Sequence, residues 1–332
     1  MLTHGNLISN EVLMAQQLGS HGDSVYVSWL PLFHDMGLIL MVLSSLYNGA
    51  PCYVMSPDEF VRRPILWLEA ISKYRGTVTA APDFAYRRCV DRIPPEEVAT
   101  LDLSSMQTML NGAEPVRVST IERFVERFRP AGLREQSIYP AYGLAESTVY
   151  VSGEHIGAGV KAFDRKALEQ GRVIEGGKEQ IRLVNCGRTT ASVDIRIVDP
   201  ESHRQLPEKT VGEIWINSAS NGKGYWKRAE LSGEAFQALI HGTDLGPYLR
   251  TGDLGFVVGD RLYICGRIKD LIIIRGRNLY PDDIASVVEA CDEKLKSRPT
   301  SAFSIDTGEE EKLVIVVAVK GPEEEHGALI DA

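Results

Sequence analysis

The sequence predicts an α/β protein in three consecutive parts, and three observations support this. Residues 1–184 alternate helical and strand patterns, which is typical of layered α/β structure around a mostly parallel sheet. Residues 185–268 change to short strands separated by glycine, proline and aspartate turns, which favours a small, mostly antiparallel, β-barrel-like subdomain. Residues 269–332 then read as a strand, a helix and another strand, which is the start of an α+β part.

The elements of the first part follow from apolar spacing. The expected helices are Asn6–Gln17, Met36–Tyr47, Pro64–Tyr74 and Val118–Phe128. The expected strands are Ser24–Leu30, Pro51–Met55, Thr77–Ala81 and Met106–Leu110. The following segment, Tyr150–Leu183, reads as a charged loop with room for one short helix.

The second and third parts contain shorter elements. Within Asn185–Val258 the runs VDIRIVD and VGEIWI, and two runs around Arg261, read as strands. Beyond Lys269 we expect a further strand, the helix Pro281–Leu295 and the strand Leu313–Val319.

Composition excludes several classes of protein. The chain has 332 residues with a net charge of −9, which argues against a nonspecific nucleic-acid binder. Its five cysteines form no CxxC pair, so neither a zinc site nor a disulfide framework is expected, and a reducing cytoplasm is the natural setting. No apolar run is long enough for a membrane span, and no signal peptide is recognisable.

Two features near residue 260 indicate nucleotide chemistry. Asp253 lies between glycines on an expected turn, where a carboxylate accepts hydrogen bonds from both hydroxyls of a ribose. Two strand-like runs then flank a short polar joint at Arg267–Asp270, which suits a hinge between domains. Together they predict a nucleotide-handling enzyme whose second domain moves.

These same residues resemble a known family. The segments RTGDLG and GRIKDLIIIRGRN resemble the adenylate-forming enzymes (acyl-CoA synthetases, adenylation domains and luciferases), and the fatty acyl-AMP ligases most closely. Four more segments agree in the same order: WLPLFHDMGL, NGAEPV, AYGLAEST and GEIWI. Six ordered segments over nearly the whole chain are far more specific than one short motif.

The resemblance implies a reaction and a set of site residues. The reaction joins a fatty acid carboxylate to the α-phosphate of ATP, releases pyrophosphate and uses Mg²⁺, for which Glu146 is the implied ligand. Implied catalytic residues are His34 and Arg267, with Lys269 as the hinge of a C-terminal lid. The implied nucleotide-binding residues are Asn111, Gly112, Ala113, Glu114, Tyr142, Gly143, Ser147, Thr148, Asp253 and Arg267.

Several of these residues have ordinary structural alternatives. Ser147 and Thr148 either donate to oxyanions or cap the adjoining helix. His34 between aromatic and apolar neighbours is either catalytic or a core histidine, and Lys269 is equally compatible with plain solvent exposure. The apolar residues Trp29, Phe33, Met36 and Leu38 either line an acyl tunnel or pack in the core.

The subclass and the partners also rest on the resemblance. The sequence DRKALEQGR within Tyr150–Leu183 resembles the insertion that restrains lid motion in fatty acyl-AMP ligases and disfavours coenzyme A. The expected acceptor is therefore an acyl carrier protein of a polyketide or peptide synthase. The alternatives are a long-chain acyl-CoA synthetase and a catalytically silent binding module. The family's phosphate loop and lid lysine are not found, so we expect an internal piece of a longer enzyme.

Overall fold

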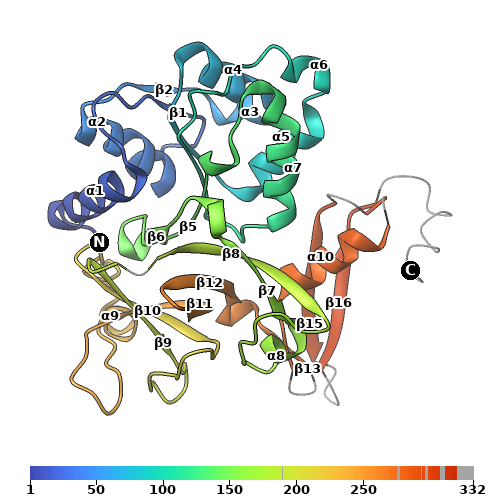
Figure 1. Ribbon diagram of the computed structural model, residues 1–332. Helices are drawn as coiled ribbons and strands as arrows, with labels where there is room; N and C mark the ends of the chain where they lie inside the picture. Colours follow the sequence, from blue (N-terminus) through green and yellow to red (C-terminus); the bar gives the residue numbers. More distant parts are fainter. Residues whose placement is uncertain (189, 275–276, 293, 296–297, 307–310, 320–332) are drawn as a thin grey trace.

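The computed structural model describes residues 1–188, 190–274, 277–292, 294–295, 298–306 and 311–319 (Figure 1). It confirms the predicted fold class, a mixed α/β protein with one largely parallel sheet and separate antiparallel sheets. Among the described residues, no helix has the length and apolar character needed to cross a membrane.

The first sheet has six strands in the order β2-β1-β3-β4-β5-β6. The pairs from β2 through β5 are parallel, and only β6 runs antiparallel to its neighbour. The strands are β1 (Tyr26–Ser28), β2 (Cys52–Val54), β3 (Val78–Ala81), β4 (Thr108–Asn111), β5 (Ile138–Tyr142) and β6 (Ser152–Gly153). Helices lie on both sides of this sheet (Figure 1), so its central strands are buried along their whole length.

The helices of this part are α1 (His4–Leu18), α2 (Ser44–Asn48), α3 (Pro57–Arg62), α4 (Ile65–Tyr74), α5 (Asp83–Arg92), α6 (Pro95–Val98) and α7 (Val118–Phe128). The four helices predicted for this part have counterparts in the structure, whereas α3, α5 and α6 were not predicted. The expected helix Met36–Tyr47 is divided: Met36–Leu43 is π-helical (η1), and only the remainder is α2. Gly37 explains the tight start of η1, because a Cβ there would lie 2.3 Å from the carbonyl oxygen of Pro31.

The second sheet also has six strands, in the order β7-β8-β12-β11-β10-β9, and all its pairs are antiparallel. Its strands are β7 (Val160–Asp164), β8 (Gln180–Arg188), β9 (Val193–Val198), β10 (Gly212–Ser218), β11 (Leu249–Val258) and β12 (Arg261–Arg267). The short helices are α8 (Arg165–Glu169) and α9 (Ala229–Phe236).

The prediction that Tyr150–Leu183 is a charged loop was wrong apart from its short helix, α8. The segment supplies β7 and the first residues of β8, so the second sheet begins before residue 185. Only Phe163 is buried in β7, where it packs against Phe256 and Tyr263, so the strand carries almost no alternating apolar signal. The division into three folding units remains a prediction.

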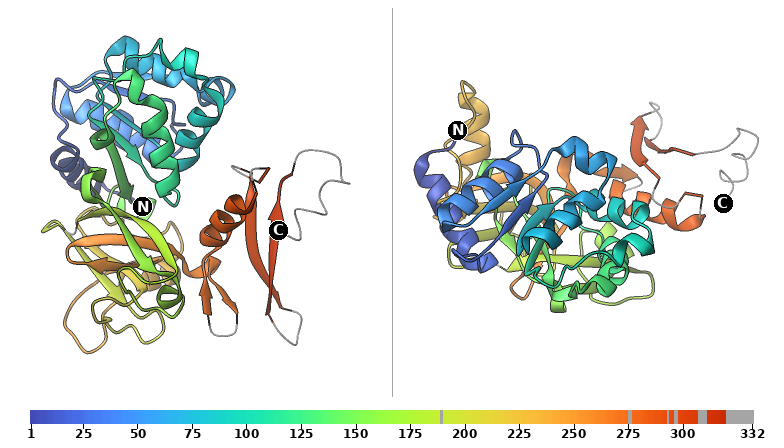
Figure 2. Two further views of the ribbon diagram at one scale, coloured as in Figure 1. Left: turned by 45° about the vertical axis from the view of Figure 1, so that its right-hand side comes forward. Right: turned by 90° about the horizontal axis from the view of Figure 1, so that it is seen from above.

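The C-terminal part forms a separate layer beside the second sheet (Figure 2). A hairpin of β13 (Ile272–Ile274) and β14 (Arg277–Leu279) leads into α10 (Pro281–Cys291) and a second hairpin of β15 (Thr300–Asp306) and β16 (Glu311–Val317). The expected helix and last strand are present with shifted bounds, whereas β15 was not predicted. Residue 293 of the expected helix and residues 320–332 of the expected lid lie outside the described residues.

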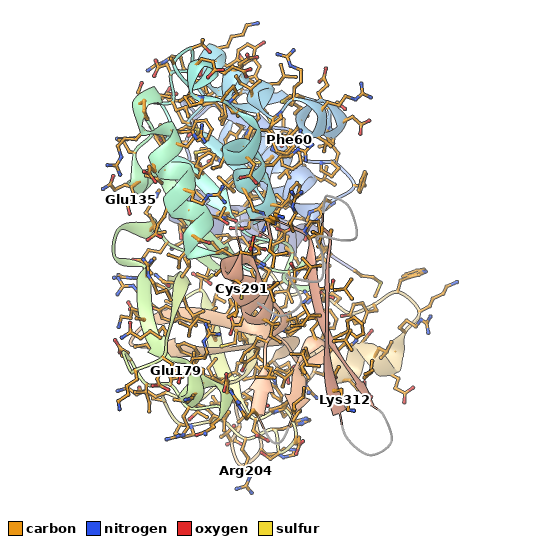
Figure 3. The ribbon with its side chains drawn as sticks, turned by 90° about the vertical axis from the view of Figure 1, so that its right-hand side faces the viewer. Phe60, Glu135, Glu179, Arg204, Cys291 and Lys312 are labelled. Atoms are coloured by element: carbon orange, nitrogen blue, oxygen red, sulfur yellow. The ribbon has the colours of Figure 1, made fainter. Side chains whose placement is uncertain are left out.

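Ion pairs join this C-terminal part to α7 and to α8. The Arg117 guanidinium, at the start of α7, donates to Glu289 Oε1 on α10 at 2.9 Å. The Arg277 guanidinium on β14 donates to a carboxylate oxygen of Glu169 on α8. Figure 3 views this side and labels Cys291 at the end of α10 and Lys312 on β16.

Glu11 makes the stability of the first part depend on pH. Its side chain on α1 is buried, one carboxylate oxygen accepts from Ser44, and the other has no partner among the described residues. Burial raises the pKa of Glu11 from 4.5 to about 7. Because the folded state holds this proton more tightly than the unfolded chain, the stabilisation is complete below pH 4.5 and is lost as pH rises through about 7.

We therefore expect the free energy of unfolding to fall by up to roughly 3 kcal/mol between acidic and alkaline conditions through this group. Glu11→Gln keeps the shape of the side chain and removes the titration, so its unfolding free energy should lack that portion of the pH dependence. Urea unfolding of both proteins at about pH 5 and pH 8 measures the difference. Parallel pH profiles for the two proteins would contradict this role for Glu11.

Candidate functional site

Two site segments meet at the carboxyl ends of the neighbouring parallel strands β4 and β5. Asn111 ends β4 opposite Pro140, and Tyr142 ends β5. The loop after β4 lies close to β5, since a Cβ on Gly112 would be 3.0 Å from the Ala141 carbonyl oxygen. In open α/β sheets, this edge is where ligands bind.

Asp83 fixes the loop after β4. It is buried at the start of α5, and its carboxylate accepts from Asn111 Nδ2, the Arg117 backbone N–H and Thr120 Oγ1 at 2.8–3.2 Å. Burial raises the pKa of Asp83, and these hydrogen bonds oppose the rise. Asn111 itself is fully buried, and its Oδ1 has no hydrogen-bond partner among the described residues.

Ala113 and Glu114, which follow in this loop, are exposed but have a defined backbone conformation and contact. Ala113 adopts a φ of +65°, a left-handed conformation that is uncommon for a residue with a Cβ. The next residue, Glu114, accepts from the Phe84 backbone N–H at 3.0 Å, which ties the loop to α5.

Asp253, Tyr142 and Arg267 form one hydrogen-bonded group. Tyr142 donates its hydroxyl to Asp253 Oδ2 at 2.7 Å, and Arg267 Nε donates to Oδ1 at 2.9 Å. The antiparallel pairing of β11 with β12 places Asp253 directly opposite Arg267. Asp253 therefore lies within β11 and not on the expected turn, although Gly252 before it has a φ of +72°.

The burial and the partners of Asp253 make its carboxylate a well-ordered hydrogen-bond acceptor. Asp253 is only 5% exposed, whereas the side chain of Arg267 is 67% exposed. Burial raises the pKa of Asp253, and Tyr142 and Arg267 oppose that rise. A carboxylate has about four lone-pair sites, so the two donors Tyr142 and Arg267 leave acceptor capacity on Asp253.

Glu146 lies next to this group, on the short 3-10 turn η4 (Ala145–Ser147) that follows β5. Its negative charge raises the pKa of Asp253, which reflects their proximity. Glu146 Oε1 accepts from the Tyr225 hydroxyl at 2.8 Å, and Oε2 has no hydrogen bond among the described residues. Gly143 is required before this turn, because a Cβ there would lie 1.8 Å from the Val149 carbonyl oxygen.

Ser147 and Thr148 anchor this segment. The Ser147 hydroxyl donates to Asn221 Oδ1 at 2.9 Å, and the Thr148 hydroxyl donates to the Ser220 carbonyl oxygen at 2.7 Å. Neither residue provides a side-chain cap for η4. Both hydroxyl hydrogens point at protein oxygens, which favours a structural role, although not the capping role that the sequence suggested.

His34 and Lys269 lie outside the hydrogen-bonded group. His34 Nδ1 lies 2.8 Å from Asp35 Oδ1 and accepts from the Met36 backbone N–H at 3.2 Å, so these side-chain contacts stay within its own segment. Lys269 is exposed on the 3-10 turn η6 (Ile268–Asp270), two residues after Arg267. Their expected roles remain predictions.

The four apolar candidates for an acyl tunnel divide into two kinds. Trp29 stacks on Phe60 at 3.9 Å between ring centroids and is buried with Met36 in the core. In contrast, Phe33 is 95% exposed and Leu38 is 42% exposed. The core-packing alternative therefore describes Trp29 and Met36.

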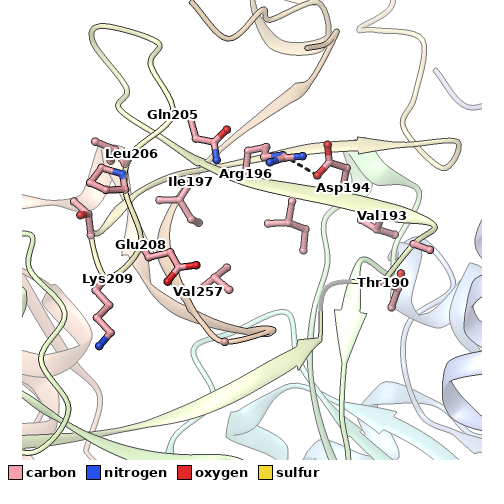
Figure 4. Close-up of a pocket in the computed structure, with 15 residues that line it drawn as sticks. Thr190, Val193, Asp194, Arg196, Ile197, Gln205, Leu206, Glu208, Lys209 and Val257 are labelled. Atoms are coloured by element: carbon pink, nitrogen blue, oxygen red, sulfur yellow. Dashed lines mark ion pairs between the residues drawn. The ribbon is translucent and has the colours of Figure 1, made fainter. Parts of the chain in front are cut away.

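One cavity lies away from this group. It has a volume of about 500 Å³ and borders β9, where Asp194 pairs with Arg196 (Figure 4). It includes none of the expected site residues. Within the described part of the chain, no cluster of three or more His, Cys, Asp or Glu side chains is arranged to hold a metal ion.

Sequence reasoning missed the residues that position the site. Tyr225 and Asn221 lie between β10 and α9, and Asp83 follows β3. The glycines of NGKGYW indicate a sharp turn, and Pro-Asp at the end of a buried strand marks a helix start. Neither signal identifies the partner side chain, because those contacts join residues far apart in the sequence.

Comparison with known proteins gives consistent results. The chain matches the AMP-binding enzyme family over residues 1–226. A medium-chain-fatty-acid–acyl-carrier-protein ligase of Moorena producens is 44% identical over 96% of this chain and 55% of its own length. A long-chain-fatty-acid–AMP ligase of Mycobacterium marinum is 38% identical over 96% of this chain and 56% of its own length.

Solved structures of fatty acyl-adenylate ligases have a similar fold. One from a study of fatty acyl-adenylate ligases from E. coli and L. pneumophila has a TM-score of 0.89 at 33% identity, covering 99% of this chain and 59% of the other. An L. pneumophila fatty acyl-adenylate ligase in complex with acyl adenylate and pyrophosphate has a TM-score of 0.79 at 36% identity, covering 100% of this chain and 59% of the other. The chain spans about half the length of the curated relatives it matches. With six ordered motifs, this fold and these relatives, the chain belongs to the AMP-binding enzyme family of adenylate-forming ligases.

Proposed function

We propose that this chain provides the adenylate-binding part of a fatty acyl-AMP ligase. The enzyme activates a medium- or long-chain fatty acid with ATP, releases pyrophosphate and passes the acyl group to a carrier protein of a polyketide or peptide synthase. The observation that carries the proposal is the buried Asp253 carboxylate, held by Tyr142 and Arg267 beside Glu146. The names of the Moorena and Mycobacterium relatives support the substrate class.

Each residue of the group has a role suited to its chemistry. Asp253 accepts from the ribose hydroxyls, and the Tyr142 ring and the loop after β4 lie along the adenine. The exposed part of the Arg267 guanidinium reaches the α-phosphate, since its planar donors suit oxyanions. Glu146 supplies a carboxylate oxygen to Mg²⁺, which when bound neutralises the phosphate charge that opposes attack by the fatty acid carboxylate.

The preference for a carrier protein over coenzyme A rests on the contact between α8 and β14. Glu169 of α8 is largely buried and accepts from Arg277, so the Tyr150–Leu183 segment is tied to the C-terminal part. Such a tie opposes rotation of a lid about the Lys269 hinge. In this proposal, a restrained lid disfavours the conformation that would accept coenzyme A.

Glu169→Ala should raise the share of coenzyme A thioester among the products, because it removes the tie without removing a strand. The measurement is product analysis by mass spectrometry with fatty acid, ATP and coenzyme A. The matched control is Glu179→Ala, which breaks the exposed Lys166–Glu179 pair within the same segment and should leave the products unchanged. An unchanged thioester share in Glu169→Ala would remove this explanation of the preference.

The function itself is tested by its products. A fatty acyl-AMP ligase releases acyl-adenylate and acylates a carrier protein, whereas a long-chain acyl-CoA synthetase makes the coenzyme A thioester. A catalytically silent binding module makes neither. We place the enzyme in the cytoplasm, in keeping with its five free cysteines.

A further inference from the structure

We propose that Tyr225 is a positioning residue for Glu146, setting the orientation in which that carboxylate meets a divalent cation. This inference rests on the proposed function, because it takes Glu146 as the metal ligand. Tyr225 lies between β10 and α9, outside every motif that the sequence singled out, and its hydroxyl donates to Glu146 Oε1 at 2.8 Å.

The segment that carries Tyr225 holds the Glu146 turn at successive positions. The Gly222 backbone N–H donates to the Glu146 carbonyl oxygen at 2.8 Å. Asn221 and Ser220 accept the hydroxyl hydrogens of Ser147 and Thr148. Backbone and side-chain contacts therefore fix residues 146–148 against residues 220–225, and Tyr225 supplies the one contact to the carboxylate itself among the described residues.

The turn that follows Glu146 needs such support. Thr148 has φ +71° and ψ −72°, and the Val149 N–H donates to the Ser147 carbonyl oxygen, which together define a classic γ-turn. This conformation is strained for a β-branched residue and persists only where surrounding contacts enforce it. The fully buried Thr148 hydroxyl, donating to Ser220, provides that enforcement from the same segment.

Tyr225 is itself held firmly enough to orient a partner. Its backbone N–H donates to Ser232 Oγ at 2.8 Å, and its ring packs against Phe236 of α9 at 5.3 Å between centroids. A donor on one carboxylate oxygen directs the other toward a ligand, as outer-shell partners of metal ligands do.

The test measures metal affinity directly. The chain is titrated with Mn²⁺ in the presence of α,β-methylene-ATP, and free Mn²⁺ is counted by electron paramagnetic resonance. Tyr225→Phe keeps the ring contact with Phe236 and should weaken Mn²⁺ binding about tenfold, the usual size for an outer-shell partner. Glu146→Gln measures the metal assignment in the same assay.

Tyr248→Phe is the matched control. It also removes a tyrosine hydroxyl that donates to a carboxylate, that of Asp194 at 2.6 Å, and it should leave Mn²⁺ affinity unchanged. Equal losses in the two tyrosine variants, or no loss in Tyr225→Phe while Glu146→Gln loses binding, would overturn the positioning role alone. No loss in Glu146→Gln, or no Mn²⁺ binding by the unsubstituted chain, would overturn the metal assignment and this inference with it.

Discussion

Glu146→Ala is expected to slow acyl-adenylate formation about 100-fold or more at ordinary Mg²⁺ concentrations. A bound metal contributes several kcal/mol of charge stabilisation in phosphoryl chemistry, and each 1.36 kcal/mol is a factor of ten in rate. The loss should therefore appear as slower release of pyrophosphate. The measurement uses an enzyme that forms acyl-adenylate. Because the defect lies in metal binding, raising Mg²⁺ should recover part of the rate.

A control separates this role from general damage to the fold. Glu122→Ala removes an exposed carboxylate that pairs with Arg182, and it should leave both the rate and its Mg²⁺ dependence unchanged. The metal assignment would be contradicted if Glu146→Ala released pyrophosphate at the unsubstituted rate when Mg²⁺ is limiting.

Asp253→Ala is expected to weaken adenylate binding by about 1–3 kcal/mol, since hydrogen bonds to a charged group are lost. The structure adds a second cost: the buried Tyr142 hydroxyl loses its acceptor. Asp253→Asn keeps the shape and one acceptor oxygen, so it should fall between alanine and the unsubstituted chain. Calorimetry with AMP measures all three affinities.

Asp194 offers a closely matched control for Asp253. Its carboxylate accepts from the Tyr248 hydroxyl at 2.6 Å and pairs with Arg196 Nε at 2.9 Å, the same two kinds of partner as Asp253 has. Asp194→Ala removes the same kinds of contact from a more exposed side chain, 42% against 7%, and should leave AMP binding unchanged. If Asp253→Ala bound AMP as tightly as the unsubstituted chain does, the ribose role would be rejected.

The strands β1 to β4 of the parallel sheet could be predicted because they are short, apolar and flanked by helices of clear periodicity, whereas β5 was not predicted. α7 matches its expected bounds, and β3 and β4 differ by two residues or fewer. In contrast, β7 is partly exposed, and its buried Phe163 packs against two aromatic rings from distant strands, Phe256 and Tyr263, so its own residues give little sign of it. β15 was missed for a similar reason, because its pairing with β16 leaves Phe303 and Ile305 exposed.

Some site residues could likewise be predicted from the sequence, whereas their hydrogen-bond partners could not. Asp253 and Glu146 were identified because chemistry and motif agree at those positions. Their partners Tyr142 and Tyr225 are 111 and 79 residues away in sequence, so only the fold reveals that each tyrosine donates to a carboxylate. The hydroxyls of Ser147 and Thr148 likewise have partners that sequence spacing does not show.

The most direct test of the account is a calorimetric titration of this chain with a non-hydrolysable long-chain acyl-adenylate analogue, with AMP as the comparison. If Tyr142, Asp253 and Arg267 form the nucleotide site and the chain also contains the acyl pocket, the analogue should bind more tightly than AMP. Asp253→Ala should then weaken both. A chain that is folded by circular dichroism but binds neither compound would contradict the account.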